Sequence, residues 1–281
     1  MKSKLIRKNI LLVFLTYIPF LYGEYQYNFT VCTMFRNQST WIQEWVAYHH
    51  YILGVEHFYL YNHDSDNDYQ ETLAPYIEAG IVEVIDWHSC EEHAIANPDS
   101  VGFVQYQLGA FNDCLKKRAY GKAKWIAVID MDEYIVPVNG SSSFHELLQK
   151  HEASDIAAIL LNWVMFGSSY VWEILPKELM VEKLLLRPPL DFEHNYQTKC
   201  IYRPEGVEFC GIHGGFYHPG YSTLHLDRND FRIHHYWMRT EKFFLQVRNP
   251  DLEGYSKKYN IERDEAMLQF VPKLKAALFP D

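Results

Sequence analysis

The sequence predicts an α/β fold with a mostly parallel sheet, followed by a less regular second half. Three observations support this prediction. Apolar runs of strand length alternate with segments of helical periodicity between Tyr27 and Pro137. Polar clusters follow these apolar runs, as expected for ligand-binding residues at the carboxyl ends of parallel strands. Beyond residue 140 the alternation weakens, and short strands or hairpins replace it.

The elements of the first half follow from their local patterns. We expect a strand at 27–35 and then a helix at 39–53, capped by Ser39 or Thr40, whose spaced Trp and Tyr residues form one apolar face. The next elements are a strand at 54–62, a helix at 69–80 closed by Gly80, a strand at 81–87, a helix at 104–121 and a fourth strand at 124–137.

The second half contains fewer regular elements. We expect a helix at 141–150, a long buried strand at 155–167, short strands or hairpins at 198–204, 206–218 and 231–237, and an amphipathic helix from about Arg263 to Leu278. Residues 24–281 therefore read as a single domain in which the second half elaborates the first.

The first 23 residues differ from the rest of the chain. Four positive charges in "MKSKLIRKN" precede an apolar run of about fourteen residues, which is the pattern of a signal peptide or an uncleaved signal anchor. We expect a membrane-associated protein or one in the secretory pathway: in the Golgi lumen if eukaryotic, at the inner membrane if bacterial. An ordinary buried N-terminal segment is the alternative.

Composition excludes some classes of protein. The 281 residues are 48% apolar and 16% aromatic, which suits a large folded core, and the net charge of −10 argues against nucleic-acid binding. Five cysteines without a CxxC pair make a structural zinc site improbable; Cys200 and Cys210 could form a disulfide or remain free. Glycosylation sequons occur at Asn28, Asn37 and Asn139.

The stretch "IAVIDMDEYIVP" places Asp130, Asp132 and Glu133 directly after a buried apolar run. These carboxylates would repel one another, so a positive partner is expected. Mn²⁺ or Mg²⁺ suits an Asp-x-Asp pair because these ions take oxygen ligands and leave positions for phosphate. The alternative is an exposed acidic turn that binds no metal. A phosphatase with an Asp-x-Asp nucleophile is another, but that motif normally lies on the first strand.

Several motifs together resemble glycosyltransferase family 92 and its family-2-like relatives. They are "MFRNQSTWIQEWVAYHHYILGVEHFYLYNHDSDND", "LAPYIEAGIVEVIDW", "QLGAFNDCLKKRAYGKAKWIAVIDMDEYIVP", "KCIYRP" and "HHYWMRTEKF", in that order. The resemblance implies a GT-A fold with a Rossmann-like sheet and a UDP-linked nucleotide-sugar donor. It also implies Mn²⁺ dependence, inversion at the anomeric carbon, and transfer of a hexose such as galactose to a glycan.

The resemblance also implies residue roles. Asp130 and Asp132 would bind the metal. A histidine would complete the metal site: His235 is the preferred candidate and His213 is the alternative. The expected donor contacts are Arg36, Asn37, Glu44, Asn62, Asp66, Asp86, Arg239 and Lys242. Gln38 replaces an acid of the relatives, which puts base or ribose contacts there in doubt.

The catalytic base is expected among acids that follow the long second-half strand. Glu182 matches an acidic position of the relatives, and Glu173 is a further candidate, with Asp191 and Glu193 also available. Trp163, Phe166, Tyr170 and Trp172 could stack on sugar rings, although an aromatic cluster is more often core. Because Asn37 is expected beside the nucleotide, we predict that it carries no glycan. A catalytically inactive carbohydrate-binding module is the alternative function.

Overall fold

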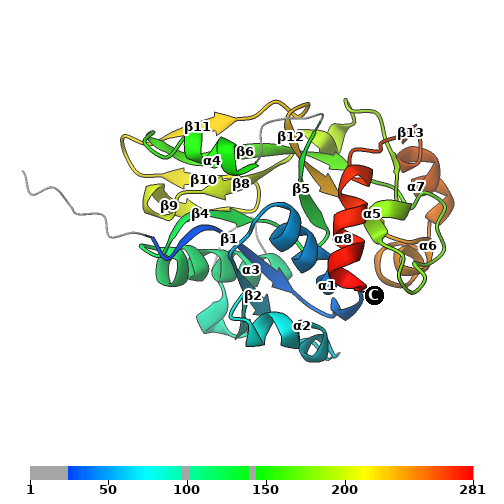
Figure 1. Ribbon diagram of the computed structural model, residues 1–281, viewed down its shortest axis with the longest axis horizontal. Helices are drawn as coiled ribbons and strands as arrows, with labels where there is room; N and C mark the ends of the chain where they lie inside the picture. Colours follow the sequence, from blue (N-terminus) through cyan, green and yellow to red (C-terminus); the bar gives the residue numbers. More distant parts are fainter. Residues whose placement is uncertain (1–24, 67, 96–101, 139–143, 281) are drawn as a thin grey trace, which may run out of the picture.

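The structure is a computed structural model that describes residues 25–66, 68–95, 102–138 and 144–280. The predicted signal segment at 1–23 and the sequon at Asn139 lie outside these residues. Figure 1 shows one curled sheet with helices packed on it. No helix among the described residues has the length and apolarity needed to cross a membrane.

The first half of the chain forms a parallel layer, as predicted. Its spatial order is β3-β2-β1-β4, made by β1 (Tyr27–Phe35), β2 (His57–Asn62), β3 (Val82–Asp86) and β4 (Ala123–Val128). The carboxyl ends of these strands therefore share one edge of the sheet. The predicted α/β class is confirmed.

The second half extends the same sheet with mixed pairing. From β4 the order continues β8-β6-β12-β5, with β11 also paired to β6. The bounds are β5 (Glu133–Pro137), β6 (Ile156–Met165), β8 (Thr198–Tyr202), β11 (Ser222–His225) and β12 (Phe231–His235). β8 runs antiparallel to β4 and β6, and β5 runs antiparallel to β12. Only the first layer is wholly parallel.

The fourth predicted strand, 124–137, is wrong as a single element. The chain leaves the sheet after Val128, turns through Asp130–Asp132, and re-enters it as β5 beside β12 rather than beside β1. The local apolar pattern continues across the turn because Ile129 and Met131 are themselves buried. This turn is what carries the carboxylate cluster.

The helices cover both faces of the sheet (Figure 1). They are α1 (Ser39–Ala47), α2 (Tyr69–Glu78), α3 (Phe103–Asp113), α4 (Phe144–Lys150), α5 (Met180–Lys183), α6 (Glu241–Phe243), α7 (Leu252–Tyr259) and α8 (Val271–Leu278). α1, α3 and α6 continue as π-helical turns at 48–52, 114–119 and 244–248. Short pairs complete the fold: β9 (Val207–Cys210) with β10 (Gly215–Tyr217), and β7 (Leu186–Arg187) with β13 (Glu262–Arg263).

One predicted helix cap and one predicted helix start differ from the structure. α1 begins after Gln38, and neither Ser39 nor Thr40 caps it. The C-terminal helix begins at Val271 rather than near Arg263. Arg263 instead ends the short strand β13, and Asp264 after it is buried between the guanidinium groups of Arg187 and Arg232, at 2.8 and 2.7 Å. A 3-10 turn at Leu268–Phe270 then leads into α8.

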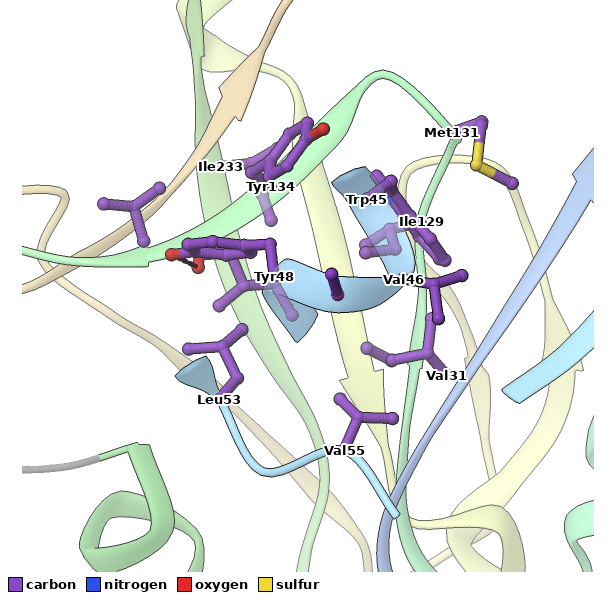
Figure 2. Packing of buried hydrophobic residues seen from close by; sticks show 14 of the residues in the cluster. Val31, Trp45, Val46, Tyr48, Leu53, Val55, Ile129, Met131, Tyr134 and Ile233 are labelled. Carbon is purple, nitrogen blue, oxygen red and sulfur yellow. Dashed lines mark hydrogen bonds between the residues drawn. The ribbon is translucent and has the colours of Figure 1, made fainter. Parts of the chain in front are cut away.

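Alternating side chains of the strands divide the core into two layers. Val31 and Ala127 face the layer that includes α1, α2, α4 and α8, whereas Cys32 and Val128 face the layer that includes α3. Figure 2 shows Tyr134 of β5 packed in the first layer near the α1 segment. All five cysteines are free, and Cys200 and Cys210 are buried without a disulfide.

Candidate functional site

A pocket of about 320 Å³ lies where β1 and β4 end, β5 begins and β12 ends. The Asp-x-Asp turn forms one wall, and the chain around α6 forms another. Its lining combines cations, carboxylates and apolar side chains: Met34, Phe35, Arg36, Gln38, Phe103, Gln107, Asp130, Met131, Asp132, His235, Trp237, Arg239, Phe243, Val247 and Arg248. We call this the donor pocket.

Glu133 fixes the shape of the turn. Its carboxylate accepts a hydrogen bond from the backbone N–H of Asp130 at 2.8 Å, and its own N–H donates to the carbonyl of Asp130 at 3.1 Å. The backbone carbonyl of Glu133 accepts from the indole of Trp45 at 2.7 Å. Burial raises the pKa of Glu133 to about 7, against the opposing charge of Lys199. Glu133 is therefore a structural acid of the turn.

Asp130 has a buried cation beside it. Its carboxylate accepts from Lys199 Nζ at 2.8 Å and from Gln107 Nε2 at 2.6 Å. Lys199 lies on β8, is fully buried, and is also 3.6 Å from the carboxylate of Glu133. Burial alone would lower the pKa of Lys199, but Asp130 and Glu133 raise it above its usual value. This lysine compensates much of the charge of the carboxylate cluster.

Asp132 is compensated by different groups. Its Oδ2 accepts from Arg248 Nη2 at 2.9 Å and lies 3.7 Å from Arg239 Nη2, while its Oδ1 lies 3.5 Å from His235 Nε2. Burial would raise the pKa of Asp132, but His235, Arg239 and Arg248 hold it far below its usual value. These three cations therefore hold Asp132 in its ionised form.

Arg239 connects the two ends of the pocket. It is buried, its Nη1 donates to Gln38 Oε1 at 2.6 Å, and its guanidinium packs over the rings of Phe243 and Trp41. Burial lowers its pKa to about 10, so it stays charged at neutral pH. Arg239 has φ of 53°, a conformation that only the surrounding packing sustains in a non-glycine residue.

Asp132 and His235 fit a divalent ion better than Asp130 does. Asp132 Oδ1 and His235 Nε2 are 3.5 Å apart, close to the about 3 Å between neighbouring ligands of an octahedral ion. Both Asp130 oxygens already have donors. Within the ranges that the structure describes, no group of three or more His, Cys, Asp or Glu side chains is arranged to hold a metal by itself. Such an ion would need phosphate oxygens or water to complete its shell.

Of the donor residues expected in the first loops, one lines the pocket and two connect neighbouring loops. Arg36 lines the pocket. Asn37, which is exposed and has φ of 55°, accepts from the N–H of Asp66 at 3.0 Å and donates its own N–H to Ser65. Asn37 and Asp66 thus tie two loops together at the sheet edge.

Asn62 and Asp86 are also loop-shaping residues in the structure. The Asn62 amide donates to Asp86 at 3.2 Å and to Tyr69 at 3.1 Å, and its carbonyl oxygen accepts from the N–H of Ser65 at 3.1 Å. Asn62 is buried and neither residue lines the donor pocket. They position the loop that approaches Asn37.

Glu44 lies away from the pocket. Its buried carboxylate accepts from the N–H groups of Met180 and Val181 at 2.8 and 3.0 Å, the first two residues of α5. Burial raises its pKa to about 7, although these two hydrogen bonds oppose the rise. The structure gives Glu44 a helix-terminus role.

The remaining expected acids and the lysine also have partners outside the pocket. Lys242 pairs with Glu173 at 2.7 Å, and both border a neighbouring groove. Glu182 on α5 pairs with Lys275 on α8 at 2.7 Å. None of these three lines the donor pocket, so the structure brings no support for Glu173 or Glu182 as the base.

The second histidine and the expected stacking residues are dispersed. His213 contacts the carbonyl of Thr198 at 3.1 Å and packs edge-on against Trp163, which also contacts the ring of His235. Phe166 is core, whereas Tyr170 and Trp172 are exposed. His235, rather than His213, is the histidine beside Asp132.

Sequence reasoning missed Lys199, Gln107 and Arg248. Lys199 and Arg248 are 69 and 116 residues from the carboxylates they contact. Lys199 stands within "KCIYRP", but its neighbours give no sign that its side chain is buried against acids. For Arg248 the only signal was its position nine residues after Arg239, at the end of the helical segment that follows Arg239.

Known proteins similar to this chain include plant and bacterial sequences. A glycosyltransferase family 92 protein from Ricinus communis is 26% identical over 238 residues, covering 82% of this chain and 40% of that protein. One from Arabidopsis thaliana is 28% identical over 138 residues, covering 49% of this chain and 21% of that protein. The chain therefore spans about two fifths of the Ricinus protein.

Similar solved structures have lower identity. S. aureus TarS in complex with UDP-GlcNAc is 12% identical, with a TM-score of 0.45, and the match covers 90% of this chain and 73% of that chain. Mycobacterium tuberculosis glucosyl-3-phosphoglycerate synthase, crystallised with Mn²⁺, UDP and glucosyl-3-phosphoglycerate, is 14% identical with a TM-score of 0.35, covering 64% and 58%. The family model of glycosyltransferase family 92 matches residues 25–271, and the chain belongs to that family.

Proposed function

We propose that the protein transfers a hexose from a UDP-linked donor to a hydroxyl of a glycan, with inversion and with help from Mn²⁺ or Mg²⁺. One observation carries the proposal: two carboxylates and three arginines converge on one pocket at the carboxyl ends of the parallel strands. The three arginines against two acids make this pocket locally positive in a chain of net charge −10. A diphosphate fits that balance.

The reaction explains why cations are needed there. The acceptor hydroxyl oxygen forms a bond to the anomeric carbon and its proton passes to water. The bond from that carbon to the diphosphate oxygen breaks, and its electron pair leaves as negative charge on UDP. Arg248 and Arg239 line the pocket, and we assign them to stabilise that charge. A preorganised hydrogen-bond donor aimed at developing negative charge contributes about 3–4 kcal/mol in an enzyme site. Arg239 is held by Gln38 and aromatic rings, so little reorganisation accompanies the reaction.

Asp132 Oδ1 and His235 Nε2 are the protein atoms that we assign to the metal. A bound divalent ion would neutralise part of the diphosphate charge. Asp130 contributes differently: bound to Lys199 and Gln107, it holds the turn and presents a partly exposed carboxylate to the donor.

Calorimetric titration with UDP, with and without MnCl₂, tests the proposal on the folded chain. We expect UDP binding that Mn²⁺ strengthens. Arg248→Gln removes one charge-assisted contact and should weaken binding about 10–100-fold. The matched control is Lys242→Gln on the same helical segment, which should bind UDP like the unaltered protein because Lys242 pairs with Glu173. Equal losses in both variants, or no UDP binding, would contradict the donor site.

A non-catalytic sugar-binding module is a second candidate. The observation in its favour is that Asp130 and Asp132 already have cationic side chains beside them, and no ready metal cluster occurs among the described residues. Such a module would show no gain in UDP affinity on adding Mn²⁺ and no release of UDP from UDP-hexoses. Membership of the family leaves the phosphatase alternative without support.

A further inference from the structure

A second cavity, of about 570 Å³, adjoins the donor pocket. It lies between the end of β6, the residues after β12 and helix α7. His235 and Trp237 line both cavities and so form a shared wall. Any molecule bound in the second cavity therefore lies next to the place we assign to the diphosphate.

Aromatic rings form much of this cavity. The ring of Trp237 lies 5.4 Å from that of Tyr255 and 5.8 Å from that of Tyr259, and Trp163 lies 4.3 Å from the ring of His235. Trp163, Trp237 and Tyr255 are only partly buried. A pyranose has an apolar face of C–H groups, and the exposed parts of aromatic rings are surfaces on which such a face packs.

Polar groups border the rings. Asp251 caps the N-terminus of α7: its Oδ1 accepts from the N–H of Gly254 at 3.0 Å, while no described residue donates to Oδ2. A Cβ at Gly254 would meet Asp251 Oδ2, so a larger residue at position 254 would displace this carboxylate oxygen. His194 is half exposed at the cavity. These groups suit the hydroxyls around a sugar ring.

The charge of the cavity favours a neutral ligand. Its one lining lysine, Lys258, pairs with Glu193 at 3.0 Å, and Asp251 adds a negative charge. An anionic acceptor would meet no surplus of positive charge here, in contrast to the donor pocket.

We propose that this cavity binds the acceptor as a neutral terminal pyranose of a glycan, stacked on Tyr255 and Trp237 and hydrogen-bonded to Asp251. The inference rests on the proposed function, because the shared wall of His235 and Trp237 is what brings the acceptor hydroxyl to the donor.

Saturation-transfer NMR with methyl glycosides of glucose, galactose, mannose, fucose and N-acetylglucosamine tests this, on protein with UDP and MnCl₂ and again without them. We expect signal for at least one glycoside. Tyr255→Ala should weaken its binding about tenfold through loss of stacking. Tyr255→Phe keeps the ring and should retain binding, and Tyr120→Ala is the control at an exposed tyrosine outside the cavity.

UDP titration of the same variants separates the two proposals. Tyr255→Ala should leave UDP affinity unchanged, because Tyr255 does not line the donor pocket. No signal for any glycoside, or signal that survives Tyr255→Ala, would overturn the acceptor cavity even where UDP binds. Absence of UDP binding would instead overturn the proposed function. The glycoside measurements would still decide whether the second cavity binds a pyranose.

Discussion

Replacing Asp132 by asparagine should change UDP binding in opposite directions with and without Mn²⁺. In Mn²⁺ the amide is a poorer ligand, and loss of one charged contact of about 1.5–3 kcal/mol corresponds to about 10–100-fold weaker binding. Without metal the ionised Asp132 repels the diphosphate and engages Arg248 at 2.9 Å. The variant removes the repulsion and weakens the hold on Arg248, because a neutral amide is a poorer acceptor than a carboxylate.

The size of the metal-free effect follows from distance. Two unit charges about 5 Å apart interact by about 3 kcal/mol at an effective dielectric constant of about 20. The donor pocket is open to water, so a smaller share is realised, and we expect metal-free affinity to rise about three- to tenfold. Arg239 and Arg248 then become available to the diphosphate.

Titration calorimetry of Asp132→Asn in both conditions measures this, with Asp155→Asn at an exposed position as the control. The amide still accepts from Arg248 but loses its charge attraction to Arg239 and Arg248. We therefore expect the free energy of unfolding to fall by about 1–3 kcal/mol, which thermal melts followed by circular dichroism would show. A variant that binds UDP like the unaltered protein in Mn²⁺, or more weakly without metal, would refute the assignment of Asp132.

Three further substitutions test the surrounding structure. Lys199→Met leaves buried carboxylates without their cation and should lower the free energy of unfolding by about 3–5 kcal/mol in denaturant titrations; a change under about 1 kcal/mol would contradict the buried pairing. Burial raises the pKa of Glu44 to about 7 from 4.5, so the folded state binds its proton more tightly and stability falls as pH rises from about 4.5 through 7, by up to about 3 kcal/mol. Glu44→Gln should remove that fall, and identical pH profiles of unfolding for variant and unaltered protein would count against it. Gln38→Glu should pair with Arg239 and lower UDP affinity several-fold. Gln43→Glu, on the exposed side of α1, should leave UDP affinity unchanged. Equal effects of the two variants in calorimetry would exclude a specific role for Arg239.

Much of the first half of the fold follows from local patterns. β1 occupies the predicted residues, α2 lies within its predicted range, and β3 ends where its polar cluster begins. The GT-A-type α/β fold implied by the family resemblance is the fold observed, with the Asp-x-Asp turn directly after β4. Strand and helix periodicities arise between near neighbours, so one sequence suffices to read them.

The cations that pair with the site carboxylates could not be read from local sequence patterns. The sequence indicated that the charge on Asp130 and Asp132 needed compensation and where the turn would lie. The sequence analysis predicted Arg239 and Lys242 as the cations of the donor site. In the structure Arg248 contacts Asp132, and Lys242 pairs with Glu173 instead.

The sequence by itself determined the α/β class, the family and the position of the carboxylate turn, because each depends on residues adjacent in the chain. Only the tertiary structure decided that β5 pairs with β12, that Lys199 neutralises Asp130, and that Glu44 binds the start of α5. The physical reason is separation along the chain. Contacts between residues 69 or 136 positions apart depend on how the whole sheet curls and on which buried charges must find partners, and no local pattern encodes that outcome.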